Sequence, residues 1–78
     1  MNRTLLGEEI ERLRSLLNID RINGAASGGA WTVKVRSVRD ITLYGEGLGN
    51  HPNEAEHAAM LDLGKKLRIA PFLLERKP

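Results

Sequence analysis

Histidine and serine side chains are the first candidates for chemistry in this chain. His51 and His57 lie six residues apart, which is not the i, i+4 spacing that places two metal ligands on one helix face, and the chain has no cysteine. Ser15, Ser27 and Ser37 have no neighbouring base in sequence, and no pair of carboxylates stands in an apolar stretch that would separate their pKa values. The sequence therefore predicts no catalytic residues, no metal ligands and no cofactor.

A glycine run, Gly45, Gly47 and Gly49, precedes Pro52 and superficially resembles a loop that cradles phosphate. It lacks the Gly-Lys-Ser/Thr of a P-loop, and no second crossover unit follows that could supply a ribose-binding acid. We therefore do not expect nucleotide binding. A tight turn over residues 45–52 explains the glycines more simply.

Pro52 marks the start of a helix of about 16 residues, because its fixed φ suits the first helical position and makes His51 the N-cap. Acidic residues follow in the first turn and basic residues in the last, as the helix dipole favours. One face carries small and apolar residues: Ala55, Ala59, Leu63 and Leu67, with Met60 and Ala58 at its edges. The alanines let the helix backbone lie close to what it covers, which we expect to be a small sheet.

An earlier amphipathic helix is predicted for residues 5–17. Its apolar residues gather on one face: Leu5, Leu6, Ile10, Leu13, Leu16 and Leu17. Residues 19–23 alternate apolar and polar side chains, which predicts a short edge strand. The stretch at 24–29 contains three glycines and no packing side chain, so we predict a flexible loop there.

A strand is predicted for residues 30–38, with Trp31 inward as a core residue beside Val33 and Val35. Arg39 and Asp40 supply a turn. A return strand at 41–45 points Ile41 and Leu43 inward, which completes a hairpin.

The chain is expected to form one domain over residues 1–78 with a short C-terminal segment at about 69–78. That segment is apolar between charged ends, and we expect it to dock on its own domain. The absence of cysteine fits a reducing cytosolic compartment. We expect no membrane span and no signal-type leader, and the 12 basic and 10 acidic residues give weak support to a polyanionic partner.

The element order and two motifs resemble the double-stranded RNA-binding domain. The motifs are Trp31-Thr32-Val33-Lys34-Val35 and Gly47-Leu48-Gly49, the latter followed after five residues by Ala55-Glu56-His57-Ala58-Ala59. The resemblance covers most of the chain. It implies a two-layer α+β fold, αβββα, in which two helices pack on one face of a three-stranded antiparallel sheet.

The chain departs from this family at the positions that contact RNA. The lysines that the family places at the start of the last helix are matched here by Pro52, Asn53 and Glu56, and Glu56 would repel phosphate. The Gly-Pro-x-His loop of the family is replaced by residues 24–29. Because phosphate contacts supply most of the affinity for nucleic acid, the resemblance implies the fold and argues against its usual function.

We therefore expect a non-catalytic protein that docks on a protein or nucleoprotein partner, and a homodimer is left open. By analogy alone, this class includes phage accessory and inhibitor proteins such as anti-CRISPR proteins. The alternative is a protein that binds double-stranded or structured RNA through basic residues of the sheet face and last helix. The first candidate surface is the open sheet face, with Thr32, Lys34, Arg36, Thr42 and Tyr44. The second is the outer face of the last helix, with His57, Leu61, Lys65 and Arg68.

Overall fold

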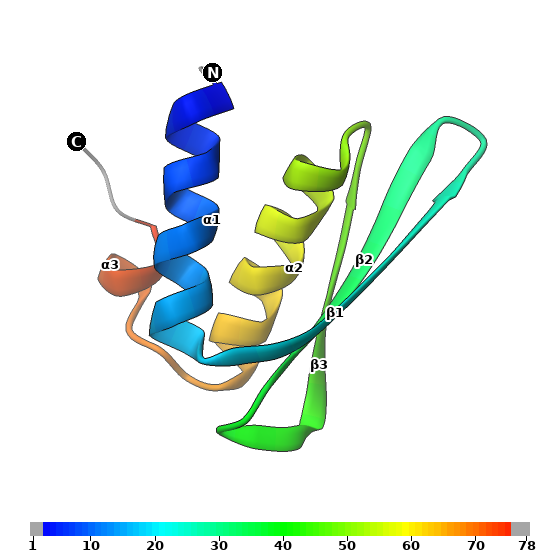
Figure 1. Ribbon diagram of the computed structural model, residues 1–78. Coiled ribbons are helices and arrows are strands. Elements are labelled where there is room, and N and C mark those ends of the chain that lie inside the picture. The colour runs from blue at the N-terminus through cyan, green and yellow to red at the C-terminus, as the bar shows by residue number, and fades with distance from the viewer. Residues whose placement is uncertain (1–2, 76–78) are drawn as a thin grey trace.

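The computed structural model describes residues 3–75, with side chains from Leu6 onward, so the predicted burial of Leu5 lies outside it. The elements follow one another as α1 (Arg3–Leu17), β1 (Ile19–Ser27), β2 (Ala30–Ser37), β3 (Asp40–Gly49), α2 (Pro52–Lys66) and α3 (Pro71–Leu74). The strands form one antiparallel sheet in the order β1-β2-β3. The predicted α+β arrangement is confirmed, and α3 is an addition to it (Figure 1).

The helix α2 is the element that joins the two layers. One side of it packs on β3 and β2, and another side packs on α1. The core lies between these elements and contains Leu13, Leu17, Val35, Met60 and Leu63, all without exposed surface. Trp31 faces this core but is only half-buried, so its inward direction is confirmed and its full burial is not.

The glycine run belongs to β3 and not to a turn, which corrects the prediction for residues 45–49. The reason is the close approach of α2. A Cβ atom on Gly45 would lie 2.2 Å from the carbonyl oxygen of Ala59, and one on Gly47 would lie 2.2 Å from that of Ala55. Glycine on the strand and alanine on the helix therefore bring the two backbones into direct contact.

The predicted loop at 24–29 is wrong over most of its length, because β1 continues to Ser27. Only Gly28 and Gly29 form the turn, with φ of 58° and 81°. The small residues of β1 are ordered by pairing with β2, where Gly24 lies opposite Val33 and Ala26 opposite Trp31. This pairing is not visible in the local composition, which is poor in the branched and aromatic residues typical of strands.

The hairpin between β2 and β3 turns at Val38 and Arg39, one residue earlier than predicted. The register of this pair shifts between Val35 and Ser37. Both predicted inward residues of β3 lie within this shift, between Gly45 and Asp40. Leu43 is half-buried, but Ile41 is 60% exposed, so its predicted inward position is wrong. The shift is the physical reason, because a simple alternation of faces does not continue through an irregular pairing.

The start of α2 is as predicted. His51 is the N-cap in an extended conformation, Pro52 occupies the first helical position, and the N–H of Ala55 donates to the carbonyl of His51 at 3.0 Å. The helix ends at Lys66, and Arg68 reverses the chain with a φ of 60°. This reversal directs the C-terminal segment back toward α1.

Candidate binding surfaces

The open sheet face carries the first set of predicted contact residues. Lys34 and Arg36 point outward from β2, and each has an acidic neighbour. The Lys34 ammonium lies 3.6 Å from a Glu46 carboxylate oxygen, and Arg36 donates two hydrogen bonds to Asp20 at 2.8 and 3.2 Å. Both predicted cations of this face are thus already paired within the chain.

Arg36 and Asp20 each stabilise the charged form of the other. The hydrogen bond to Asp20, with a smaller contribution from Tyr44, raises the pKa of the Arg36 guanidinium. The same hydrogen bond lowers the pKa of the Asp20 carboxyl. Tyr44 therefore lies at this pair, and the structure brings these predicted residues together.

The remaining sheet residues differ in their roles. Thr32 lines an open hollow of about 270 Å³ together with Glu46, Gly47 and Leu48. Thr42 is exposed, and both its N–H and its hydroxyl donate to Asp40 near the turn. The sheet face thus consists of ion pairs, a shallow hollow and local turn contacts.

The outer face of α2 carries the second set. His57, Leu61 and Lys65 follow one another at intervals of four residues, and this spacing places them on one side of the helix. His57 and Leu61 are half-buried, while Lys65 and Arg68 are exposed. Leu61 packs against the core, so its predicted place on the outer face of the helix is wrong. The structure therefore places His57, Leu61 and Lys65 in a row along α2, with Arg68 just past its end.

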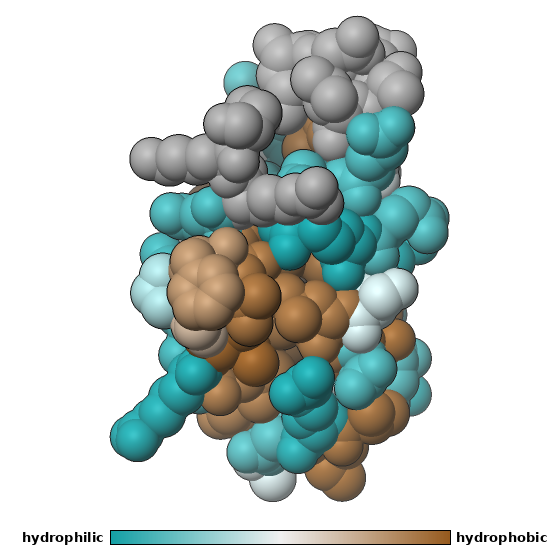
Figure 2. Space-filling view, turned by 90° about the vertical axis from the view of Figure 1, so that its left-hand side faces the viewer, coloured by the Kyte–Doolittle hydropathy of each residue, from teal (hydrophilic) through white to brown (hydrophobic). Residues whose placement is uncertain are grey.

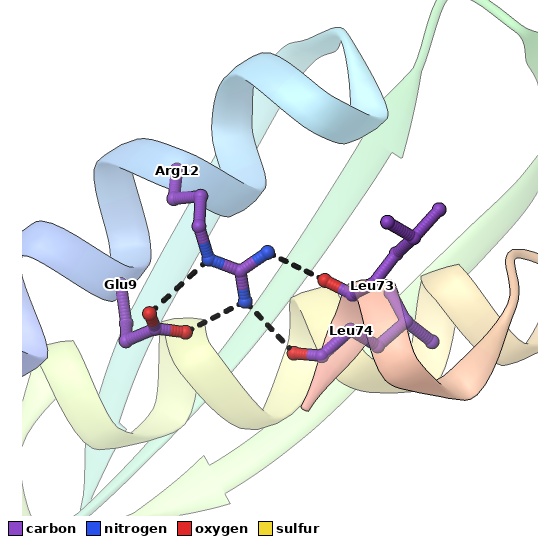
Figure 3. A network of polar contacts seen from close by, with 4 residues as sticks. All are labelled: Glu9, Arg12, Leu73 and Leu74. Atoms are coloured by element: carbon purple, nitrogen blue, oxygen red, sulfur yellow. Dashed lines mark hydrogen bonds and ion pairs between the residues drawn. The ribbon is translucent and has the colours of Figure 1, made fainter. Parts of the chain in front are cut away.

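The C-terminal segment docks on its own domain, which confirms that prediction for the described residues. Leu74 is 2% exposed, and its side chain packs over Gly64 of α2. Arg12 of α1 donates to the carbonyl oxygens of Leu73 and Leu74, the latter at 3.1 Å. Figure 3 shows the guanidinium held from its other side by Glu9, at 2.7 and 3.1 Å.

Although Leu74 and the backbone of α3 are held against the domain, two large apolar side chains of α3 remain exposed to solvent. Phe72 is 76% exposed and Leu73 is 41% exposed. We call these two residues the tail patch. Figure 2 views the molecule from the side on which α1 and α3 lie, and apolar surface gathers near the centre of that face.

The tail patch was not among the predicted contact residues, although a signal for it existed. Ile69, Phe72, Leu73 and Leu74 crowd into six positions after the last long helix. A helix of four residues can turn only part of its surface toward the domain, so some of these side chains must face outward. The sequence did not show which ones.

Within the described part of the chain, no group of three or more His, Cys, Asp or Glu residues could hold a metal ion. No helix between residues 3 and 75 is long and apolar enough to cross a membrane. Comparison of the chain with models of known protein families, with curated proteins and with solved structures finds no match.

Proposed function

We propose that this chain is a non-catalytic binding protein that docks on a protein or nucleoprotein partner through the tail patch. The observation that carries the proposal is the exposure of Phe72 on a helix that is anchored on both sides. Burying such a side chain stabilises a complex by about 1.5–3 kcal/mol, and aromatic residues are enriched at the centres of interfaces.

The anchoring of α3 supports a binding role because it presents the tail patch in one geometry. Leu74 holds the helix to α2, and Arg12 holds the carbonyl end to α1. A side chain on a preorganised element loses less entropy on binding than one on a loose tail. An exposed Phe72 in this setting is better suited to a partner than to water.

The charges next to this region suit a partner that carries negative charge. Leu74 packs over Gly64, which directly precedes the exposed Lys65 and lies four residues before the exposed Arg68. Among the described residues, neither of these two cations is within ion-pair distance of a carboxylate. These exposed cations stand in the segment that leads to α3, and their charge keeps a nucleoprotein partner within the proposal.

The αβββα order is compatible with the double-stranded RNA-binding fold, and we propose that the chain shares this fold without its usual RNA contact. Two observations support the separation of fold from function. Glu56 stands where the family has a cation and is 8% exposed in an ion pair with Arg14. The cations of the sheet face, Lys34 and Arg36, are paired with acidic residues.

The test is capture of a partner from a cell lysate by the tagged protein, with and without nuclease, followed by mass spectrometry. Phe72→Asp should abolish capture of the proteins that the parent retains. Ile41→Asp is the matched control, because Ile41 is a similarly exposed apolar residue on the sheet hairpin.

Variants of the sheet face test the other candidate surface and give the result that would contradict the proposal. If Lys34→Glu with Arg36→Glu abolishes capture while Phe72→Asp does not, the partner docks on the sheet face and the tail patch is rejected. Loss of all captured proteins on ribonuclease treatment would instead show that RNA links them to the chain, which favours the RNA-binding alternative.

A further inference from the structure

The sheet has two outer edges, and the structure treats them differently. On β3, the backbone N–H of Glu46 donates to the Asp62 carboxylate at 2.9 Å, and the Lys66 ammonium donates to the carbonyl oxygen of Tyr44 at 2.7 Å. Lys66 and Asp62 also form an ion pair at 3.0 Å. Side chains of α2 therefore occupy backbone groups that would otherwise be open to another strand.

The turn between β1 and β2 determines which backbone N–H and C=O groups of β1 have no partner on β2. Gly28 and Gly29 both have positive φ, so they form a two-residue hairpin turn in which Ser27 and Ala30 are the hydrogen-bonded closing pair. In an antiparallel ladder, hydrogen-bonded and non-bonded pairs alternate. The N–H and C=O groups of Ile22, Gly24 and Ala26 consequently point away from β2, toward the outer edge.

The same alternation can be checked on β3. Carried across β2, it predicts that Glu46 and Leu48 direct their backbone groups outward, because they face Lys34 and Thr32 in the non-bonded pairs. Glu46 is the residue whose N–H donates to the Asp62 carboxylate. The assignment of the outward groups on β1 therefore rests on a pattern that the opposite edge obeys.

The outer edge of β1 has none of the usual protections over residues 22–27. This stretch contains no charged residue and no proline. In the part of the chain that the structure describes, no side-chain hydrogen bond reaches its backbone. The helix α2 lies mainly over β2 and β3, and Figure 1 shows the β1–β2 hairpin extending past the helices.

We propose that β1 is a self-association edge, on which β1 of a second copy of this chain pairs in antiparallel orientation around Gly24. This two-fold register places Gly24 opposite Gly24 and Ile22 opposite Ala26. It joins all of the outward backbone groups of Ile22, Gly24 and Ala26 in one ladder, so the two sheets become continuous.

The side chains favour a second copy over an unrelated strand. In this register Arg21 lies opposite Ser27 and Asp20 opposite Gly28, so like charges do not oppose one another. Ile22, which is 38% exposed on the helix side of the sheet, gains Ala26 of the other copy as a neighbour. Because α2 lies over β2 and β3, both copies can keep their helices on the same side of the joined sheet.

The test measures the mass of the 78-residue chain by sedimentation over a wide concentration range, together with amide hydrogen exchange by NMR. We expect a dimer in which the amides of Ile22, Gly24 and Ala26 exchange more slowly as concentration rises. The amides of Asn23 and Ala25 are internal controls, because the alternation assigns them to β2 at every concentration.

Two variants of β1 should shift the protein to the monomer, with dimerisation at least about tenfold weaker. Ala26→Pro removes an outward N–H, and Ile22→Lys adds a charge at the edge without changing the backbone. Leu48→Pro is the matched control, because Leu48 is an outward position of β3. Circular dichroism confirms that each variant folds.

The expected result is a dimer that both β1 variants weaken at least about tenfold and that Leu48→Pro retains. A protein that stays monomeric up to millimolar concentration would overturn the proposal. So would a dimer that survives Ile22→Lys, or pairing of β1 only with an extended segment of another protein.

Discussion

The carboxylate of Glu56 in α2 accepts two hydrogen bonds from the guanidinium of Arg14 in α1, at 2.9 and 3.0 Å. The Glu56 side chain is 11% exposed, whereas the Arg14 side chain is 43% exposed. The pair joins the two long helices at the N-terminal half of α2, the region where the resemblance places RNA contacts. The Glu56 carboxylate therefore holds α1 and α2 together through its pair with Arg14.

Removing Arg14 should destabilise the fold because it leaves the Glu56 carboxylate without its partner. We expect Arg14→Ala to lower the free energy of unfolding by about 1–3 kcal/mol, since the site is only partly buried. Glu11→Ala is the control, because Glu11 is 79% exposed and lies 4.0 Å from Arg14, and its cost should stay below about 0.5 kcal/mol. Urea unfolding measures both, and equal costs would show that the Glu56 pair is not stabilising.

Replacing glycine by alanine should have opposite effects on stability at Gly47 and at Gly7. Gly47→Ala would place a methyl group 2.2 Å from the Ala55 carbonyl oxygen and 2.3 Å from the Ala59 nitrogen, so α2 would have to move off the sheet. We expect a loss of about 3 kcal/mol or more. Gly7→Ala in α1 meets no atom within 4 Å and should stabilise by about 0.5–1 kcal/mol. Thermal melts of the two variants in opposite directions would confirm the close approach of α2 to β3.

Asp62 should contribute to the pH dependence of stability. The hydrogen bond from the Glu46 N–H, helped by Lys66 and opposed by partial burial, lowers the pKa of the Asp62 carboxyl. Its pKa is then lower in the folded than in the unfolded chain, so its stabilising effect is complete above about pH 4 and is lost as pH falls through the folded value. Asp62→Asn should therefore flatten the fall of the melting temperature below about pH 4. An unchanged acid profile in this variant would contradict the assignment.

The sequence predicted best those elements whose signals are local. Pro52 and the alternation of Val33 and Val35 define α2 and β2 within a few residues of themselves. The second half of β1 could not be predicted in the same way, because Gly24 and Ala26 belong to a strand only through their partners on β2. The same holds for the glycines of β3, whose role depends on α2.

The tail patch shows the same limit for the candidate site. Its exposure depends on Arg12, which binds the carbonyl of Leu73 across 61 positions of sequence. Apolar residues in a C-terminal segment indicate docking, but which of them remain outside is decided by such distant contacts. The acidic partners of Lys34 and Arg36 were likewise hidden, since they come from β3 and β1.

Binding to duplex RNA should be weak. We expect no submicromolar affinity for an RNA duplex of about 20 base pairs near physiological salt, because Pro52, Asn53 and the paired Glu56 stand where the family has cations. A fluorescence-anisotropy titration at several salt concentrations is the measurement. Tight binding with a steep salt dependence would require several phosphate contacts and would favour the RNA-binding alternative.

Leu74 and Phe72 lie on the same short helix and should separate folding from binding. Leu74→Ala should lower the free energy of unfolding by about 2–5 kcal/mol, because the side chain is 2% exposed and packs over Gly64. Phe72→Ala should change it by no more than about 0.5 kcal/mol, because the ring is 76% exposed. The loss of free energy of unfolding for Arg12→Ala should lie between these two values, since this change releases the α3 carbonyls but leaves Leu74 in place. Urea unfolding gives the three values, and a Phe72→Ala cost equal to that of Leu74→Ala would mean that the ring packs on its own domain and is not available to a partner.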